Sequence, residues 1–399
     1  TPLYSSAASD VYKRQPSIFN YVNPQARVNE IIDGGNNNSL FGTIRAEYEI
    51  IDGLTAAWFG SWRKTDNFYG GYQSPKTTLP DAMNQKGIAT RSGSFGDEKL
   101  TNFIVNYRKV VGDHSFGGML GYEWQRATYD GFASTGRGFI NDFFSFNALQ
   151  ASDVTAARSG DISSYKNDQT LVSFFGRFNY TYKGKYMATA TFRRDGSSKF
   201  GANNKWANFP SMSLAWIISE ESFLKDVTVI NSLKLRAGYG VTGSQAGLGP
   251  LNSQRLVRPS GTAFFEGNVI PNFAITQNQN QDLRWETRGM FNAGLDFALL
   301  DSKLTGTVDF YIGSTKDLLF DYIVPQPPYP FPTIKANIGK MQNQGIELSL
   351  NYNLIDKEDF GITLGGNFAS NRNTIKELSG SLNGIELNTN YVRWGGGYS

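Results

Sequence analysis

Apolar and polar side chains alternate most clearly between Leu171 and Arg194. The pattern predicts two long strands joined by a tight turn at Lys183-Gly184-Lys185, within LVSFFGRFNYTYKGKYMATATFRR. Each arm has roughly ten or more residues, which is the length of a tilted strand that crosses a bilayer and about twice that of an ordinary soluble strand. One face of the hairpin has no charge. Its side chains are Val172, Phe174, Gly176, Phe178, Tyr180, Tyr182, Tyr186, Ala188, Ala190 and Phe192.

This hairpin alone fits two interpretations, a transmembrane hairpin of an outer-membrane barrel and a soluble β-sandwich, whose strands also alternate. Tyrosines lie near the turn, where the aromatic girdle of a membrane barrel is expected. The same alternation recurs along the chain and predicts about twelve strands in total. The further strands lie at about 40–50, 54–62, 102–108, 116–124, 212–218, 233–241, 285–297, 304–310, 346–352 and 360–368.

The connections between these strands are sorted by length. Each odd strand joins the next by a short turn, such as Ile51-Asp52-Gly53, Leu300-Asp301-Ser302 or a short capped helical turn at Ser219–Leu224. The other side carries long connections, at about 67–98, 130–168 and 244–283 and in a Pro-rich segment after strand ten. Short turns at one rim and long loops at the other are typical of outer-membrane barrels. The sequence therefore predicts an all-β fold, a transmembrane antiparallel β-barrel.

The composition agrees with a barrel. The chain has 399 residues, of which 18% are charged and 14% aromatic, and it contains 43 glycines. Its mean hydropathy of -0.37 is low because half of each barrel strand faces the lumen. No apolar run approaches the roughly 18 residues of a membrane helix. The net charge of +3 does not imply nucleic acid, and the absence of cysteine excludes disulfides and thiolate metal sites.

Two local motifs suggest chemistry but favour a structural interpretation. Gly238-Tyr239-Gly240-Val241-Thr242-Gly243 matches the dinucleotide fingerprint, yet it lacks the following helix and βαβ unit, so we interpret it as glycines on a crowded strand. His114 is the only histidine, so a catalytic triad or a histidine metal site would have to use it. It lies in a tight turn on the short-turn rim. We therefore expect no enzymatic activity and no catalytic residue.

Three carboxylates in one long connection raise the question of a calcium site. Asp153, Asp161 and Asp168 have a spacing that matches no compact calcium loop. We interpret them as solvated loop carboxylates and expect neither a metal nor a cofactor.

Three segments resemble the signature regions of SusC/RagA-type TonB-dependent outer-membrane transporters, or TonB-linked receptors. The first is RDGSSKFGANNKWANFPSMSLAWIISEESFL at Arg194–Leu224, and the second is LKLRAGYGVTGSQ at Leu233–Gln245. The third combines DFYIGSTKDLLF at Asp309–Phe320 with NIGKMQNQGIELSLNY at Asn337–Tyr352. The resemblance covers roughly residues 171–370, and the preceding part fits by architecture more than by motif.

The resemblance implies a barrel of about 22 strands around an N-terminal plug. It also implies a periplasmic TonB contact that powers import, through a plug region missing here, and a SusD-like surface lipoprotein as a lid. The implied substrates are oligosaccharides or peptides, and the implied location is the outer membrane of a Gram-negative bacterium, in contact with outer-membrane lipid.

This sequence is expected to hold only part of such a protein. Residues 16–399 are predicted to form a partial barrel domain without plug, signal peptide or closing strands, and the chain stops abruptly at Ser399. Thr1–Gln15, TPLYSSAASDVYKRQ, has neither strand alternation nor the layout of a signal peptide. We interpret it as a non-native or disordered tail.

Two classes of function stay open. The first is TonB-coupled nutrient import. The second is a passive outer-membrane pore, or a structural or adhesive barrel without energy coupling. A plug domain upstream of Pro16 in the full-length gene would distinguish them.

The long connections are rich in aromatic side chains. These rings either pack the connections together and under a lid protein, or stack on sugar rings and hold peptide side chains. Prolines at 325, 327, 328, 330 and 332 would stiffen the fourth connection and lower the ordering cost of binding. The predicted substrate-binding residues are Phe68, Tyr69, Tyr72, Phe139, Phe143, Phe144, Tyr329 and Phe331, and the same loops also contain Phe132 and Phe146.

Overall fold

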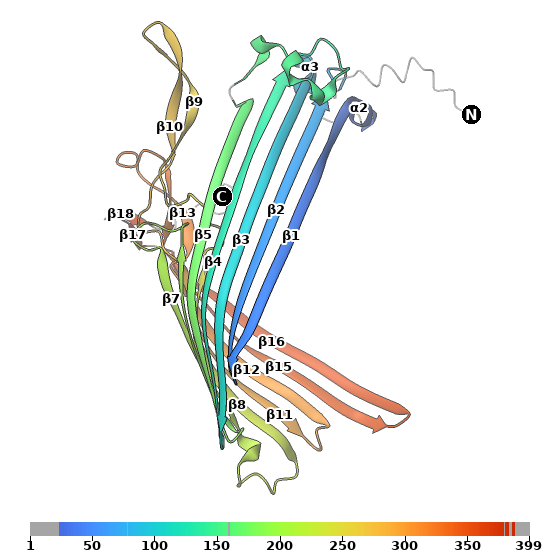
Figure 1. Ribbon diagram of the computed structural model, residues 1–399, viewed down its shortest axis with the longest axis vertical. Coiled ribbons are helices and arrows are strands. Elements are labelled where there is room, and N and C mark those ends of the chain that lie inside the picture. Colours follow the sequence, from blue (N-terminus) through green and yellow to red (C-terminus); the bar gives the residue numbers. More distant parts are fainter. Residues whose placement is uncertain (1–23, 78, 159, 379, 383–384, 388–399) are drawn as a thin grey trace, which may run out of the picture. The chain divides into compact units, whose positions relative to one another are not determined.

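The main element of the fold is one antiparallel sheet in which consecutive long strands are neighbours (Figure 1). The structure is a computed structural model that describes residues 24–77, 79–158, 160–378, 380–382 and 385–387. The tail predicted at 1–15 and the chain end at 399 lie outside these residues. The sheet confirms the all-β class and the predicted number of strands. Its 12 strands, in order, are β1 (Ile31–Ile51), β2 (Leu54–Gln73), β3 (Ile88–Val111), β4 (His114–Arg137), β5 (Ile162–Tyr182), β6 (Tyr186–Ser197), β7 (Trp206–Ile217), β8 (Ile230–Ser244), β11 (Glu286–Leu299), β12 (Leu304–Lys316), β15 (Lys340–Lys357) and β16 (Phe360–Glu377).

The chain divides into two compact units. The residues up to Thr43, Ser61–Lys99 and Arg126–Asp168 form the first, which holds the ends of β1–β5 next to their long connections. Ile44–Gly60, Leu100–Gln125 and the chain from Gln169 onwards form the second. Each unit is described by itself below.

The strand register confirms the predicted alternation. In β5 and β6, Phe178 is paired with Ala190 and Tyr180 with Ala188, all from the predicted apolar face. Ala188 is paired in turn with Leu214 of β7. Paired residues of adjacent strands lie on the same face of a sheet. A continuous apolar face therefore runs across the strands, and Arg177 and Arg193 alternate to the opposite, polar face.

Aromatic side chains form two bands on the apolar face. At the short-turn end, Tyr182 stacks on Tyr186, and Tyr186 on Trp216, each at 6.2 Å between ring centroids. At the other end, Phe174 stacks on Trp206 at 6.2 Å. Trp206 and Trp216 are ten residues apart on β7. This is about 33 Å along a strand, or about 25 Å in height at a tilt of about 40°. The spacing equals the apolar band of an outer-membrane barrel, about 25 Å.

Several strands extend further than predicted. β1 begins at Ile31, well before the strand predicted at about 40–50, and includes the glycine- and asparagine-rich residues Asp33–Asn38. A Cβ on Gly35 would lie 2.4 Å from the Phe68 carbonyl oxygen, so glycine allows this close pairing. Similarly, β2 continues to Gln73 and β4 to Arg137, which shortens the connections predicted at 67–98 and 130–168. The strand limits were predicted from alternating apolar residues. Where neither face of a strand is apolar, this pattern is absent although the backbone pairing continues, so the predicted strands are too short.

The remaining long connections contain small sheets of their own. β9 (Leu256–Phe265) and β10 (Asn268–Gln277) form a hairpin between β8 and β11. Between β12 and β15, β13 (Leu319–Ile323) pairs with β14 (Thr333–Asn337). A third pair consists of β17 (Gly380–Leu382) and β18 (Ile385–Leu387). The predicted connections at 244–283 and after strand ten are therefore partly β-structured.

In the described residues, helical structure is confined to short segments. Besides α2 (Pro24–Glu30) and α3 (Pro80–Asn84), it consists of 3₁₀ turns at Ser145–Asn147, Leu149–Ala151, Val154–Ala156 and Ile218–Glu220. The last of these overlaps the helical turn predicted at 219–224, and no side chain caps it. Across the part of the chain that the structure describes, no helix has the length and apolar character needed to span a membrane.

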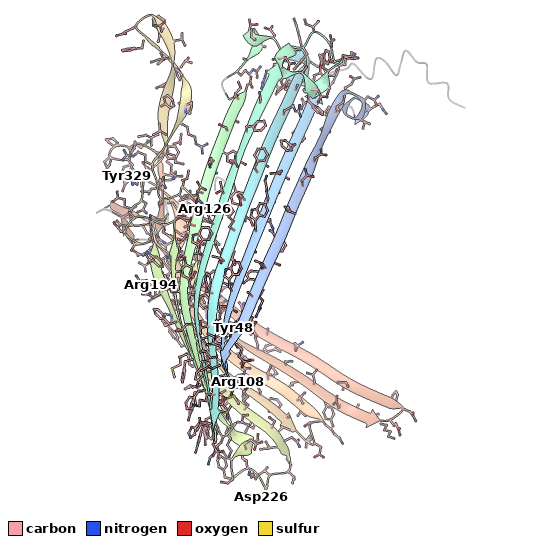
Figure 2. The ribbon with its side chains drawn as sticks, viewed as in Figure 1. Tyr48, Arg108, Arg126, Arg194, Asp226 and Tyr329 are labelled. Atoms are coloured by element: carbon pink, nitrogen blue, oxygen red, sulfur yellow. The ribbon has the colours of Figure 1, made fainter. Side chains whose placement is uncertain are left out.

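The buried cores lie in the connections and at the strand ends next to them, rather than along the long sheet, whose side chains stand on both faces of each strand (Figure 2). Trp285 illustrates this. It was predicted to begin the strand that the structure places at Glu286–Leu299, but it precedes that strand and is buried between Phe200 and Phe209. The Trp285 indole nitrogen donates to the Lys205 carbonyl oxygen at 3.1 Å. Burial of this ring fixes the connection between β6 and β7.

We predict that Phe178→Arg damages folding far more than Arg177→Phe. Phe178 lies on the apolar face, where a cation at mid-depth in a bilayer costs about 2–4 kcal/mol. Arg177 alternates to the polar face, where its loss changes only the polar lining. The measurement is the yield of heat-modifiable protein on a gel, for the full-length protein. Equal yields for the two variants would mean that the faces are assigned wrongly.

Candidate functional site

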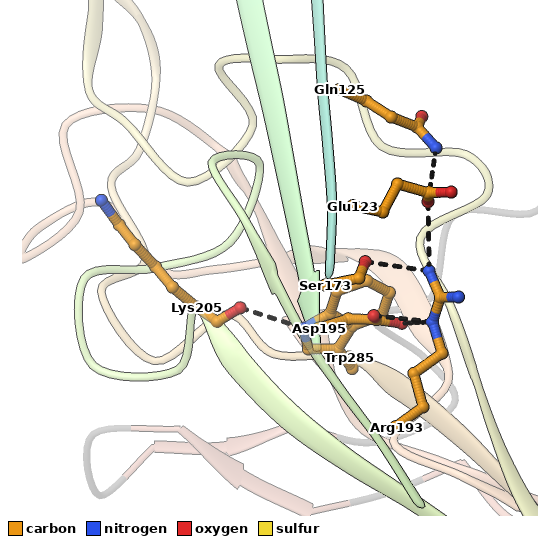
Figure 3. A network of polar contacts seen from close by, with 7 residues as sticks. All are labelled: Glu123, Gln125, Ser173, Arg193, Asp195, Lys205 and Trp285. Carbon is orange, nitrogen blue, oxygen red and sulfur yellow. Dashed lines mark hydrogen bonds and ion pairs between the residues drawn. The ribbon is translucent and has the colours of Figure 1, made fainter. Parts of the chain in front are cut away.

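A charged network crosses β4, β5 and β6 on the polar face (Figure 3). The Arg193 Nε donates to Asp195 Oδ1 at 2.7 Å, and its Nη2 donates to Ser173 Oγ at 2.8 Å. Glu123 Oε1 lies 3.4 Å from the same Nη2 and accepts from Gln125 Nε2 at 2.9 Å. Ser173 and Asp195 are buried. Removal of one partner would leave a charge in a poorly hydrated place, which is strongly unfavourable.

A second network crosses β8, β11 and β12 on the same face. The Arg236 Nε donates to Asp296 Oδ1 at 3.0 Å, and its Nη2 donates to Asp309 Oδ2 at 2.9 Å. The guanidinium passes over Gly294, where a Cβ would lie 2.5 Å from Asp309 Oδ1. A groove of about 290 Å³ lies beside this arginine, and its lining includes Lys234. The polar face therefore holds its charges in fixed positions, suited to polar partners.

In the first unit, three side chains meet at the Asp142 carboxylate. The Tyr72 hydroxyl donates to Oδ1 at 2.6 Å, and the Ser74 hydroxyl donates to Oδ2 at 3.2 Å. Lys76 Nζ also lies 3.2 Å from Oδ2. The Tyr72 ring is buried edge-on against Phe139 at 5.6 Å, and Phe139 is buried as well. These contacts join the end of β2 to the connection that follows β4.

The ionisation of this cluster follows from its contacts. Burial of the Tyr72 phenol, its hydrogen bond to Asp142 and the negative charge of that carboxylate raise the pKa of Tyr72. Burial acts on Asp142 too and by itself would raise its pKa. The hydrogen bonds from Tyr72, Lys76 and Ser74 outweigh this and hold the pKa of Asp142 below its ordinary 3.8. The neutral phenol and the ionised carboxylate therefore stabilise each other.

The predicted aromatic residues of the first unit fall into a buried and an exposed group. Tyr72 and Phe139 form the buried group, so in this structure they pack the connections. Phe143 is 84% exposed and Phe144 53%, and the two rings meet edge to face at 5.0 Å. The other exposed rings are Phe68, Tyr69 and Phe132, whereas Phe146 is partly buried and covers Gly70.

Three of these rings lie on a strand rather than in a loop. Phe68, Tyr69 and Tyr72 were predicted in the connection after strand two, but the structure places them on β2. Phe68 packs edge-on against Phe95 at 5.4 Å. A strand position holds a ring more rigidly than a loop does, because its backbone is fixed by the ladder.

The remaining predicted residues, Tyr329 and Phe331, belong to the second unit. Tyr329 packs, half-buried, against a core that includes Tyr322 and Ile334. Phe331 is held through its backbone by the Asn278 side chain, whose Nδ2 donates to the Phe331 carbonyl oxygen at 2.6 Å. The structure therefore separates the predicted residues into one set per unit.

Asparagine side chains fasten the connection before β11 to the β13–β14 sheet. Asn278 Nδ2 also donates to the Thr333 carbonyl oxygen at 2.9 Å, and Asn280 Nδ2 donates to that of Lys335 at 2.8 Å. Asn337 Nδ2 donates to the Arg284 carbonyl oxygen at 2.7 Å. These side-chain amides donate to backbone carbonyl oxygens that a neighbouring strand would otherwise bind. The sequence does not predict these hydrogen bonds, because isolated asparagines in a loop carry no sign of their partners.

The motifs that favoured a structural interpretation lie in ordinary secondary structure. Gly238–Gly243 lies within β8, as expected for strand glycines. His114 begins β4, with Nδ1 at 2.8 Å from the Tyr180 hydroxyl and its ring 4.8 Å from that of Tyr182, in the aromatic band at the short turns.

The prediction of solvated carboxylates is wrong for one of the three. Asp161 is buried, pairs with the Arg137 guanidinium and accepts from the Arg158 backbone nitrogen at 2.6 Å. Asp153 and Asp168 are exposed and accept from the hydroxyls of Thr155 and Thr128. A buried carboxylate requires a paired cation, and the sequence did not indicate that Arg137 would be adjacent.

The contacts within the polar networks could not be predicted from the sequence. Alternation in the predicted hairpin puts Arg193 on the polar face. It did not predict that Arg193 touches Glu123, because that contact depends on the register of three strands. The same holds for Arg236 with Asp296 and Asp309.

Comparison with known proteins identifies the class. The model of the family described as "TonB dependent receptor-like, beta-barrel" matches residues 3–398. TonB-dependent receptor P3 of Formosa agariphila is 36% identical over 360 residues, which are 89% of this chain and 35% of that protein. TonB-dependent receptor SusC of Bacteroides thetaiotaomicron is 36% identical over 287 residues, 70% of this chain and 27% of that protein.

A solved structure shows the same fold. The RagAB peptide importer in the "closed-closed" state superposes with a TM-score of 0.77 at 24% identity, over 90% of this chain and 40% of that chain. The chain belongs to the TonB-dependent receptor β-barrel family, and the predicted likeness to its SusC/RagA type is confirmed. It spans about a third of the length of the curated relatives it matches.

We predict that acid weakens the cluster around Asp142. Because the folded-state pKa of Asp142 is lowered, its stabilisation is present above the ordinary value of 3.8 and is lost as the pH falls through the lower folded value. The contribution of Tyr72 to stability depends on pH in the opposite direction. It is present below pH 10 and is lost as the pH rises through the raised pKa of Tyr72. Asp142→Asn should speed amide hydrogen exchange around Tyr72 and Phe139 roughly tenfold at neutral pH. The variant should also lose the increase in exchange that acid causes in the native protein.

Asp153→Asn provides the control in the same connection. Asp153 accepts from Thr155 and has no contact with Tyr72, so exchange near Tyr72 should stay as in the native protein. If Asp142→Asn left exchange unchanged at neutral pH, the Asp142 cluster would not hold these connections together.

Proposed function

We propose that the parent protein imports oligosaccharides or peptides across the outer membrane of a Gram-negative bacterium, in a TonB-coupled manner. In this proposal the chain supplies barrel wall and extracellular connections. The main support is a sheet with one apolar face between two aromatic bands and one charged face, in a member of the TonB-dependent receptor family. The RagAB peptide importer has the same fold and motivates the peptide class, and the resemblance to SusC/RagA-type transporters motivates the oligosaccharide class.

The two faces of the sheet suggest an orientation in the membrane. The apolar face would contact lipid, and Trp206 and Trp216 would lie at its two interfaces. The polar face, with Arg193 and Arg236, would line the lumen and contact a plug or a passing substrate. The short turns would then be periplasmic and the long connections extracellular.

The partners follow from the same proposal. A plug region would contact TonB, and a SusD-like surface lipoprotein would cover the extracellular connections. Residues 16–399 would be one part of the barrel domain. The charged networks have structural partners throughout, so we assign no catalytic role to the chain and no cofactor.

The predicted aromatic residues that are not buried are the proposed substrate contacts. In the first unit these are Phe143 and Phe144, with Phe68 and Tyr69 on β2. In the second unit they are Tyr329 and Phe331, which are fixed by the amide contacts of the β13–β14 connection. Tyr72 and Phe139 would act indirectly, by packing the connections that present the exposed rings.

A protonophore distinguishes import from passive diffusion. We expect cells with the full-length gene to take up labelled oligosaccharides or peptides, and uptake to stop when the proton gradient that drives TonB is collapsed. A gene deletion gives the background. Uptake that persists with the protonophore, at the same rate, would instead support the passive pore.

We predict that Phe144→Ala weakens substrate binding about fivefold, because it removes one stacking contact of about 1 kcal/mol. Tyr329→Ala should weaken it similarly and also loosen the core around Tyr322. The measurement is calorimetry on the full-length transporter with the imported substrate. Ile140→Ala is the control, since Ile140 is 97% exposed in the same connection and offers no ring. Native affinity in both aromatic variants would remove these rings from the site.

A further inference from the structure

A groove of about 940 Å³ lies in the apolar face, across β3, β4, β5 and β6. The side chains that line it on this face have no charge, and the one charged lining residue, Arg177, alternates to the polar face. The walls include Val105, Tyr107, Leu120, Phe174, Phe178 and Phe192. All of them belong to the second unit.

Gly118 creates the hollow. A Cβ placed on Gly118 would have no heavy atom within 4 Å, so the space above this residue is open. On the neighbouring strand, Gly176 is paired with Phe192, and the Leu120 side chain lies over it, with its Cδ2 atom 3.1 Å from where a Cβ would be. The missing side chain at Gly118 therefore leaves a depression with aromatic walls.

The end of the groove towards the long connections has an aromatic and a cationic edge. The Phe174 ring meets Tyr122 at 5.3 Å and Trp206 at 6.2 Å. Arg194 is the residue paired with Phe174, and its Cζ lies 5.5 Å from the Trp206 ring centroid (Figure 2). Its neighbour Arg193 is bound to carboxylates on the other face, whereas in the described part of the chain no carboxylate pairs with Arg194.

We propose that this groove and Arg194 form a binding site for a membrane lipid with a phosphorylated headgroup. One acyl chain would lie over Gly118, and Arg194 would bind the phosphate. The proposal rests on the membrane location proposed above. It places the lipid in the leaflet next to the long connections, because Arg194 lies at that end of the groove.

The chemistry of the groove and of Arg194 favours a lipid over a protein as the occupant. The groove lies between the aromatic bands, at a depth where hydrocarbon chains are the surrounding solvent and fill any hollow. A guanidinium is weakly hydrated and forms paired hydrogen bonds with phosphate, so it suits the headgroup level. Its contact with Trp206 keeps it at that edge, since arginine stacks on aromatic faces.

The test uses the full-length protein in nanodiscs that contain phosphatidylethanolamine and phosphorylated lipid A, the outer-leaflet probe, with native mass spectrometry after release. We expect the native protein to retain lipid A, and Gly118→Phe to lose it because the ring fills the groove. Gly366→Phe is the matched control. Gly366 is an apolar-face glycine paired with Leu350 on β15, and it also has free space above it.

Arg194→Gln tests the headgroup contact. It should lower lipid A retention about fivefold, the effect of one arginine at a membrane surface, and should not change retention of dephosphorylated lipid A. Arg177→Gln, on the polar face, should retain lipid A as the native protein does. Retention of the phosphorylated and dephosphorylated forms to the same extent in the native protein would overturn the headgroup assignment.

Two other results would overturn the site as a whole. One is equal retention by Gly118→Phe and Gly366→Phe. The other is a groove occupied by a partner protein or a second copy, seen as protein cross-links to a photoreactive group at Leu120. Heat-modifiable migration and protonophore-sensitive uptake are measured on the same variants. They report on the barrel and on import, so a failure of the lipid proposal is distinguishable from a failure of the proposed function.

Discussion

Backbone pairing between adjacent strands is the constraint on which the rest of this structure depends. A strand in lipid has no water to satisfy its N–H and C=O groups, so each must bond to its neighbour. Pairing runs without a register shift through β5–β6 and β6–β7. Because side chains alternate, a shift of one residue would move the whole apolar set to the other face of the sheet. The register therefore decides which side chains form the apolar face and which form the polar face.

The same register positions the charges. Arg236 can reach Asp309 only because Gly294 lies between them with no side chain. Arg193 likewise meets Glu123, two strands away. Each network ties adjacent strands together on the polar face, as ring stacking does on the apolar face. Neighbouring residues of one strand thus have opposite roles, and Arg193 and Arg194 show this most clearly.

The connections are stabilised in a different way. The long sheet contains few buried side chains, whereas buried cores form around Tyr322 and Trp285 in the connections and around Tyr72 at the end of β2. Backbone groups there are bound by side-chain amides such as Asn278 and by carboxylates such as Asp161. Small sheets like β13–β14 are marginal alone, since a two-stranded hairpin has little hydrophobic area. Amide contacts and a local hydrophobic core supply the stabilisation that a two-stranded sheet lacks. They also hold the proposed binding residues in fixed positions.

The sequence by itself determined the class, the number of long strands, the face of each side chain and the sorting of the connections. These follow from alternation with a period of two, which is local and visible in a single chain. It also located aromatic residues that could bind substrate, but not which of them are exposed. Tertiary structure decided that Tyr72 is buried and Phe144 exposed, that Asp33–Asn38 is strand, and that Asp161 pairs with Arg137. These outcomes depend on which strands and connections become neighbours, and residues far apart in the chain carry no local sign of that contact.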